Sequence, residues 1–191
     1  MRNVILASAS RYKIDSMKKS GVPFVAIDSE VDEKKLPREN AYELVKELSK
    51  LKARAVYNKN PDSIVIGVDS VGCFKGRILE KPKNKEEAIK RLKMLSGKEH
   101  SAITGITIIN GGKESVEVVE TKIYFRELSN EEIIGYVEED KDLVKYCLGY
   151  DPEGKISATF IKSINGSYNN ILSGMPVEKV KEMLDTPRPD N

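Results

Sequence analysis

The stretch Val4-Ile5-Leu6-Ala7-Ser8-Ala9-Ser10-Arg11-Tyr12-Lys13 decides how the chain is organised. Its apolar start predicts a buried strand, its serines predict a short loop, and residues 13–21 have the pattern of a helix. A loop that leads from a strand into a helix N-terminus offers free backbone N–H groups and a positive dipole end. The stretch therefore either binds an anion such as phosphate, helped by Arg11 and Lys13, or is a plain N-cap in which Ser8 and Ser10 cap the helix.

The composition is that of one charge-rich globular domain. The 191 residues include 32 basic and 30 acidic side chains, so the formal net charge is only +2 and any phosphate must be held by local charge. This balance argues against nucleic acid as a partner. No apolar run approaches the ~18 residues that span a bilayer, and the N-terminus lacks a signal-peptide cleavage site. We therefore expect no membrane partner and a cytoplasmic location. Cys73 and Cys147 have no metal-binding spacing and are expected to be buried free thiols.

An acidic run follows the second expected strand, at residues 24–27. Asp28, Glu30, Asp32 and Glu33 place four carboxylates within six residues. Such a run is usually a solvated loop. The alternative is a site for a hard divalent cation, because Mg²⁺ prefers carboxylate and phosphate oxygens.

The pattern over residues 37–59 predicts a long helix, and a lysine lies on its apolar face. Lys52 falls inside a stripe that consists of Ala41, Leu44, Val45, Leu48, Leu51, Ala55 and Val56. A lysine in this position either extends its ammonium to the solvent at the edge of the core or points it into a cleft.

A third strand is predicted at residues 63–68, and it ends at Asp69 and Ser70. Open α/β sheets place ligand chemistry at such carboxyl ends. A hairpin over residues 71–79 then brings Lys81 to its far end. The remaining pattern predicts helices at residues 85–95, at 129–139 and from 175 onward, and strands at 101–109, 115–125 and 156–164. His100, the single histidine, is expected to be structural. Residues 1–185 are expected to form one domain and residues 186–191 a flexible tail.

The candidate site residues have chemistry in common. Ser8, Lys13, Lys52 and Lys81 are candidate anion binders, and Glu33 and Asp69 are candidate carboxylates. The set lacks a Ser-His-Asp order, a thiol paired with a base and a Walker phosphate loop. It contains the groups that phosphoryl chemistry uses, namely cations for phosphate oxygens, ligands for a metal and a carboxylate for water. Hydrolysis of a nucleotide polyphosphate is the simplest reaction that uses all of them.

Short motifs along nearly the whole chain resemble those of the Maf proteins. Leu6-Ala7-Ser8-Ala9-Ser10 is similar to the family's L-A-S-x-S, Lys52-Ala53-Arg54-Ala55 to its K-A-x-A, and Gly67-Val68-Asp69-Ser70 to its G-A-D-T. The later motifs stand in the family's order: Glu80-Lys81-Pro82, Leu95-Ser96-Gly97-Lys98, Thr104-Gly105, Ile164-Asn165-Gly166-Ser167-Tyr168 and Gly174-Met175-Pro176. Each motif is weak alone, but the ordered series is specific.

The resemblance implies an α/β fold, an elongated mixed β-sheet flanked by helices with a central cleft between two lobes, similar to that of the inosine triphosphate pyrophosphatases. It implies a nucleoside triphosphate pyrophosphatase that cleaves between the α and β phosphates with a divalent cation, Mg²⁺, Mn²⁺ or Co²⁺. Under this interpretation Asp69 is the general base or a metal ligand and Glu33 supports the metal. The triphosphate is held by Ser8, Lys13, Lys52 and Lys81. Family members are often homodimers, although no apolar surface stripe in this sequence argues for one.

Three departures from the family pattern affect the expected substrate. Tyr12 stands at the first arginine position of the family's S-P-R-R, where its ring could stack on a base but cannot replace a bidentate grip on phosphate. Ser70 replaces a common threonine, and Asp151 stands where the family's glutamine would be, in an altered loop over residues 143–152. These three positions correspond to ones that the family uses to sort bases. Two alternatives therefore stay open: a purine house-cleaning enzyme for inosine or xanthosine triphosphate, and a non-catalytic nucleotide-binding regulator of cell division.

Overall fold

The computed structural model describes residues 2–146 and 148–186. Within these residues, seven strands form one sheet in the order β2-β1-β3-β5-β6-β7, with β4 paired to β3. Strands β1 and β2 pair in parallel with their neighbours, whereas β3, β5 and β6 form a long antiparallel frame. The strands are β1 (Val4–Leu6), β2 (Val25–Ala26), β3 (Ile64–Phe74), β4 (Arg77–Leu79), β5 (Glu99–Asn110), β6 (Lys113–Phe125) and β7 (Ile161–Asn165). The expected elongated, mixed sheet is confirmed.

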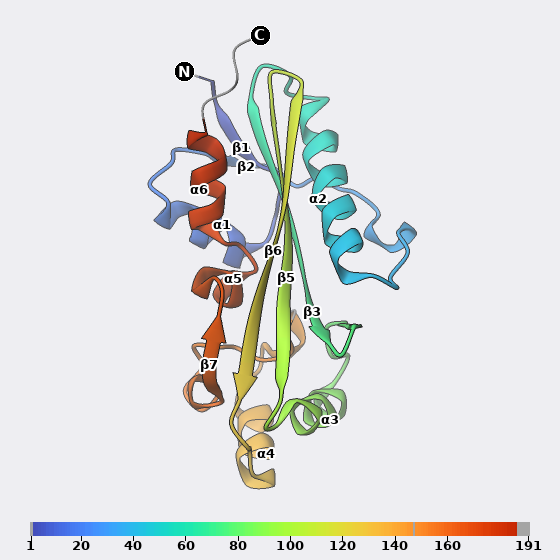
Figure 1. Cartoon of the computed structure of the whole chain (residues 1–191), viewed down its shortest axis with the longest axis vertical. Coiled ribbons are helices and arrows are strands. Elements are labelled where there is room, and N and C mark those ends of the chain that lie inside the picture. The colour runs from blue at the N-terminus through green and yellow to red at the C-terminus, as the bar shows by residue number, and fades with distance from the viewer. Residues whose placement is uncertain (1, 147, 187–191) are drawn as a thin grey trace.

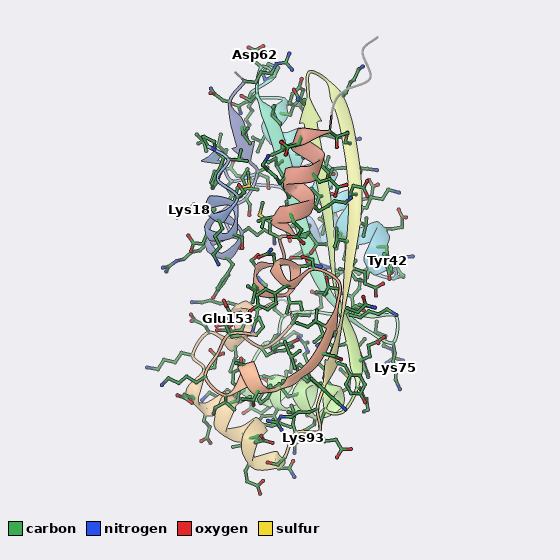
Figure 2. All side chains as sticks on the ribbon, turned by 60° about the vertical axis from the view of Figure 1, so that its left-hand side comes forward. Lys18, Tyr42, Asp62, Lys75, Lys93 and Glu153 are labelled. Carbon is green, nitrogen blue, oxygen red and sulfur yellow. The ribbon has the colours of Figure 1, made fainter. Side chains whose placement is uncertain are left out.

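Helices flank this sheet along its length (Figure 1). Figure 1 shows α2 along one side of the long strands, α1, α5 and α6 along the other, and α3 and α4 at the far end of the molecule. Figure 2 shows the same extension from another side, with Asp62 near one end and Lys93 of α3 near the other. The helices are α1 (Arg11–Lys19), α2 (Ala41–Tyr57), α3 (Lys85–Leu95), α4 (Asn130–Glu139), α5 (Tyr168–Ser173) and α6 (Val177–Asp185). Single 3₁₀ turns occur at Glu33–Lys35, Leu143–Lys145 and Ser157–Thr159.

The backbone of α2 lies directly on the sheet because two strand residues are glycines. A Cβ atom at Gly67 would lie 2.2 Å from the carbonyl oxygen of Ser49, and one at Gly105 would lie 2.2 Å from that of Val45. A buried hydrogen bond of 2.8 Å between the hydroxyls of Ser49 and Thr107 fixes the same contact. These contacts fix the position of α2 against β3, which matters for any side chain that α2 directs at that strand.

The apolar side chains pack into several groups along the sheet. The largest group surrounds α3 and α4 and contains Leu92, Phe125 and Tyr150. The others lie toward the opposite end, under α1 and α6 on one face of the sheet and under α2 on the other. We call these two parts the α3–α4 half and the α1–α2 half. Strand β3 contributes to both halves, because Ile66 belongs to the α1–α2 half and Phe74 to the α3–α4 half.

Two predictions within the α1–α2 half were wrong in detail. Strand β3 does not end at Asp69 but continues to Phe74, since β5 pairs with it along nearly its whole length. In α2, Leu51 is 36% exposed, and Ala53 rather than Leu51 packs against the sheet. The predicted stripe is buried as expected from Ala41 to Leu48 and at Val56.

The segment before β7 also differs from its prediction. Residues 156–164 were expected to form a strand, yet Ser157–Thr159 is a 3₁₀ turn and β7 begins only at Ile161. Side-chain hydroxyls hold the turn, because Ser157 Oγ donates to the carbonyl of Asp151 and Thr159 Oγ1 to that of Ile156. Such local bonds compete with pairing in a sheet. Helix α5 was not predicted at all.

The remaining expectations have mixed outcomes. His100 is structural, since it is 2% exposed, its Nε2 lies 2.9 Å from the hydroxyl of Tyr150 and its ring packs on Phe125. Cys73 is only half-buried and carries a free thiol, whereas Cys147 lies outside the described residues.

Thr186 donates its N–H to Glu182 at the end of α6, and the rest of the predicted tail, 187–191, lies outside the described residues. In the described part of the chain, no helix combines the length and the apolar character that crossing a bilayer requires.

Candidate active site

A gap in the sheet opens a cavity beside the middle of β3. Strand β1 pairs with β3 only as far as Leu6 and Ile66, and β4 begins to pair with it at Gly72. Between these points, residues 67–71 of β3 pair with β5 alone among the described strands. A cavity of about 690 Å³ lies here and is lined by residues of both halves. Its volume is within the range of small-molecule sites.

Lys52 of α2 joins two carboxylates inside this cavity. Its Nζ lies 2.5 Å from Oδ1 of Asp69 and 2.7 Å from Oε1 of Glu33, and only 12% of its side chain is exposed. Burial alone would lower the pKa of Lys52, but the ion pairs with Asp69 and Glu33 outweigh burial and raise it. The ammonium is therefore a fixed positive charge, and the lysine points into a cleft rather than to the solvent.

Two neighbouring residues of β3 contact lysines on opposite faces of the sheet. Side chains alternate along a strand, so Asp69 and Ser70 project to different sides. Asp69 meets Lys52 of α2, and Ser70 Oγ accepts a hydrogen bond of 3.0 Å from Lys13 Nζ of α1. Gly174, at φ +63°, closes the second contact, because a Cβ there would lie 2.1 Å from Ser70 Oγ.

Three lysines act together on Glu33. Burial by itself would raise the pKa of this half-buried carboxyl, but the hydrogen bond from Lys52 and the charges of Lys52, Lys13 and Lys81 lower it. All three ammonium groups therefore lie close enough to one carboxylate to affect its ionisation. Such a concentration of positive charge suits a polyanion that carries several phosphates.

The loop between β1 and α1 has the form expected from the opening stretch. The backbone N–H of Ser10 donates to Ser8 Oγ over 3.1 Å, and Ser10 precedes the helix without a side-chain capping bond. The first-turn N–H groups of α1 thus have no serine cap at the point where the helix dipole is positive. Ser8, Ser10, Tyr12 and Lys13 all line the cavity.

The structure brings together most of the residues predicted for the site. The cavity is lined by Ser8, Tyr12, Lys13, Glu33, Lys52, Asp69, Ser70 and Lys81. Asp151 is not among the lining residues; its Oδ1 accepts the N–H of Glu153 in a tight turn, and its own N–H donates to the hydroxyl of Tyr136. This carboxylate therefore organises its own loop.

Other lining residues were not predicted from the sequence. Arg38, just before α2, pairs with Glu80 beyond β4 at 3.1 Å and connects the loops at the edge of the cavity. Lys83 adds a cation beside Lys81. Tyr146 reaches the cavity from the altered loop, and its ring contacts that of Tyr12. One feature of the sequence could have pointed to Tyr146. Two of the departures from the family pattern, at position 12 and in the loop over residues 143–152, each place a tyrosine in this region.

The two carboxylates that contact Lys52 match the protein ligands of a divalent cation that takes its other ligands from bound phosphates. Glu33 and Asp69 converge on the same positive centre, Lys52 Nζ. Among residues 2–146 and 148–186, no group of three or more His, Cys, Asp and Glu side chains is arranged to hold a metal. A site of two carboxylates with substrate phosphates matches the way Mg²⁺ is commonly bound, since this ion keeps few protein ligands.

Comparison with known proteins agrees with this arrangement. The family model described as Maf-like protein matches residues 3–186. The chain belongs to the Maf family. Its curated relatives include a dTTP/UTP pyrophosphatase of Alkaliphilus oremlandii, 41% identical over 187 residues that cover 96% of this chain and 95% of that protein. Another, from Symbiobacterium thermophilum and of the same name, is 37% identical over 184 residues, with 96% and 93% covered.

A solved structure supports the fold of this Maf protein. The HAM1 protein of Coxiella burnetii superimposes with a TM-score of 0.52 over 96% of this chain and 98% of that one. The two sequences are only 14% identical, so the likeness concerns the fold alone.

Proposed function

We propose that this protein is a nucleoside triphosphate pyrophosphatase, a hydrolase that cleaves the bond between the α and β phosphates and releases a nucleoside monophosphate and pyrophosphate. The observation that carries the proposal is that Lys13, Lys52 and Lys81 line one cavity with Glu33 and Asp69, and that Lys52 pairs with both carboxylates. The names of relatives that align over nearly the whole chain support the same activity.

Each group in the cavity has a defined role in the proposed reaction. The N-terminus of α1, Ser8 and the three lysines bind and orient the phosphates. The carboxylate of Asp69 orients and deprotonates the attacking water. The water oxygen bonds to the α-phosphorus while its proton passes to Asp69, the bond from the α-phosphorus to the bridging oxygen breaks, and pyrophosphate leaves. The lysines neutralise the charge that develops on the phosphate oxygens.

We further propose that Glu33 and Asp69 hold a divalent cation when substrate is bound. A cation there would supply charge neutralisation at the phosphates. Because Lys52 pairs with the same two carboxylates, the proposal includes a shift of its ammonium from them toward the phosphates.

The activity is tested by pyrophosphate release from a panel of nucleoside triphosphates, including dTTP, UTP and ITP, with Mg²⁺, Mn²⁺ or Co²⁺. Turnover is expected in the wild-type protein and its loss on chelation with EDTA. In Asp69→Asn, kcat should fall by about 10²–10⁴, the usual contribution of a positioned acid or base. The fold should persist, since an amide oxygen still accepts from Lys52.

Three results would contradict parts of this proposal. Substantial activity in Asp69→Asn would remove that residue from the mechanism. Tight nucleotide binding without pyrophosphate release in any metal would instead favour a regulator that has lost turnover. A marked preference for ITP over dTTP and UTP would favour the purine house-cleaning alternative.

A further inference from the structure

Helix α5 depends on its neighbours for its position. It has six residues, Tyr168–Ser173, and an isolated helix of this length is not stable in water. It packs on α1, on the side of the long strands opposite α2 (Figure 1). Its place in the fold is therefore set by the contacts that its side chains make with the sheet and with α1.

One buried amide connects α5 to the sheet. Asn170 is 1% exposed, and its Oδ1 accepts a hydrogen bond of 2.6 Å from Thr104 Oγ1 of β5. Its Nδ2 lies 3.1 Å from Thr121 Oγ1 of β6, 3.2 Å from the carbonyl oxygen of Ala102 and 3.4 Å from that of Val119. Burying an amide costs free energy unless its polar atoms are paired, and here both are. Such a network fixes one orientation of the helix on the sheet, which an apolar contact would not do.

The C-terminal end of α5 lies against the contact between Lys13 and Ser70. Gly174 follows the helix, and its N–H donates to the carbonyl oxygen of Asn170 over 2.9 Å. A Cβ atom on Gly174 would lie 2.1 Å from Ser70 Oγ and 3.6 Å from Lys13 Nζ. Asn170 thus holds, from one helical turn away, the backbone that packs on these two groups.

The sheet connects Asn170 to the same contact by a second route. Thr104, which donates to Asn170, is the register partner of Ser70 in the pairing of β3 with β5. Directly opposite residues of an antiparallel pair project to the same face, with their Cβ atoms about 5 Å apart. The amide therefore lies beside Ser70 on the face of α1, whereas Asp69 and Lys52 meet on the other face.

A pair of hydroxyls joins α5 to α1 itself. Ser16 Oγ donates to Ser173 Oγ over 2.7 Å. Ser16 follows Lys13 by three residues, so both side chains project from the same side of α1. The position of α5 therefore affects both Lys13 and Ser70.

We propose that Asn170 is a positioning residue for phosphate binding: through α5 and Thr104 it holds Ser70 and Lys13 so that the ammonium stays directed at the cavity. This inference rests on the proposed function, in which Lys13 binds the phosphates. It adds that the affinity for phosphates depends on a residue that is not among those lining the cavity.

The test measures binding rather than turnover. Affinities for inorganic tripolyphosphate and for the α,β-methylene analogue of UTP are measured by calorimetry on the full chain with Mg²⁺. Asn170→Ala should weaken both ligands by about threefold or more, because Lys13 loses its fixed orientation. Lys13→Ala itself should weaken them by about tenfold or more, as expected for a lost charge-assisted hydrogen bond.

Double variants show whether the effect passes through Lys13. In a Lys13→Ala background, Asn170→Ala should cause no further loss of affinity, because the group that it positions is absent. In a Lys52→Ala background it should cause the same fold loss as in the wild type, because Lys52 lies on the opposite face of the sheet. An equal loss in both backgrounds would show that Asn170 only stabilises the protein, which overturns the proposal.

Two single variants serve as a control and as a milder test. Asn169→Ala removes the same type of side chain one position earlier, where Nδ2 donates to Glu178 at the surface over 3.0 Å, and should leave both affinities unchanged. Thr104→Val removes the hydroxyl that donates to Asn170 and keeps nearly the same shape, so it should weaken both ligands by about twofold or more. If Asn170→Ala does not fold, unchanged affinities in Thr104→Val overturn the proposal.

The outcomes separate this inference from the proposed function. Unchanged affinities in Asn170→Ala, together with a lower free energy of unfolding, would overturn the positioning role alone. A wild-type protein that binds neither ligand would overturn the proposed function and this inference with it. Absence of pyrophosphate release combined with the expected binding pattern would leave the positioning role intact and remove only the activity.

Discussion

Lys52 is the residue on which the geometry of the site depends most. It holds Asp69, which is 7% exposed, and Glu33 at the same time. In Lys52→Ala the Asp69 carboxylate loses its counter-ion and the triphosphate loses a cation. We expect KM to rise at least about tenfold. The free energy of unfolding should fall by about 1–3 kcal/mol, the penalty for a buried group left without its partner. Steady-state kinetics and urea unfolding measure the two effects.

Lys46→Ala is the matched control for this prediction. Lys46 lies on the same helix and pairs with Glu43 at the surface over 3.5 Å. Such exposed pairs contribute at most about 1 kcal/mol, so neither KM nor stability should change appreciably. Equal KM values for Lys52→Ala and the wild type would mean that the lysine only stabilises the fold.

For single residues, the sequence predicted which side chains belong to the site more reliably than it predicted the contacts that those side chains make. A lysine within an apolar stripe requires a partner, and Lys52 has two. Asp151 had no comparable physical signal, since its proposed role came only from its place in the family pattern, and its carboxylate serves a local turn instead. Tyr146 was missed because ring contacts between loops far apart in the chain leave no local pattern.

At the scale of the elements, the direct contact between α2 and the sheet controls the distance from Lys52 to Asp69. In Gly67→Ala the added Cβ would meet Ser49 O at 2.2 Å, so α2 must move away from β3. We expect a loss of about 1–3 kcal/mol in unfolding free energy, as overpacking in a core usually costs, and a fall in kcat as α2 carries Lys52 away from the cavity. Thermal unfolding and kinetics test both effects.

Gly135→Ala provides the opposite result as a control. Gly135 lies in α4, and a Cβ added to it would meet nothing within 4 Å, so alanine should stabilise the helix by about 0.5–1 kcal/mol and leave turnover unchanged. If Gly67→Ala behaved like Gly135→Ala, the close packing of α2 would not position Lys52 relative to Asp69.

The burial of His100 in β5 predicts how stability depends on pH. Burial lowers the pKa of His100 to about 4, below the value of about 6.5 for an imidazole in the unfolded chain. Between these values the unfolded state binds a proton that the folded state does not. Stability should therefore fall as the pH decreases, by roughly 2 kcal/mol from pH 7 to pH 5. Urea unfolding at a series of pH values measures this slope.

His100→Gln should remove that slope because the chain has one histidine. The absolute stability of the variant does not matter for the comparison. Carboxylates with lowered pKa values, such as Glu132 at about 2, lose their contribution to stability only below about pH 4.5. They therefore do not contribute to the change in stability between pH 7 and pH 5. An unchanged slope in His100→Gln would assign the effect to other groups.

Helices and strands with a strong apolar periodicity or clear capping residues could be predicted. Elements that depend on local side-chain hydrogen bonds could not. The capping box of Ser129 and Glu132 correctly located α4. Helix α5 was missed because six residues are too few for a periodic signal, although Ser167 before it and Gly174 after it are typical cap residues. The extension of β3 beyond Asp69 depends on pairing with β5, which only tertiary structure reveals.

On the scale of the whole molecule, the long strands connect the two halves on either side of the cavity. Strand β3 carries Val68 in the α1–α2 half and Phe74 in the α3–α4 half, and β5 likewise carries Ile106 and Ala102. If one half lost its packing, the strands that it shares with the other half would lose part of their support. The other half depends on the same strands. The gap that forms the cavity interrupts pairing on one edge of β3 only, so the connection through β5 remains.

We therefore propose that residues 1–185 unfold as one cooperative domain despite the cavity. Scanning calorimetry should give a single transition whose calorimetric and van't Hoff enthalpies agree. Leu92→Ala, a fully buried position of the α3–α4 half, should lower the stability measured by that single transition by about 2–5 kcal/mol rather than split it. Far-ultraviolet and near-ultraviolet circular dichroism should then lose their signals at the same temperature. Two separated transitions in the variant would show that the halves are independent domains, and the strands that cross the cavity would not couple them.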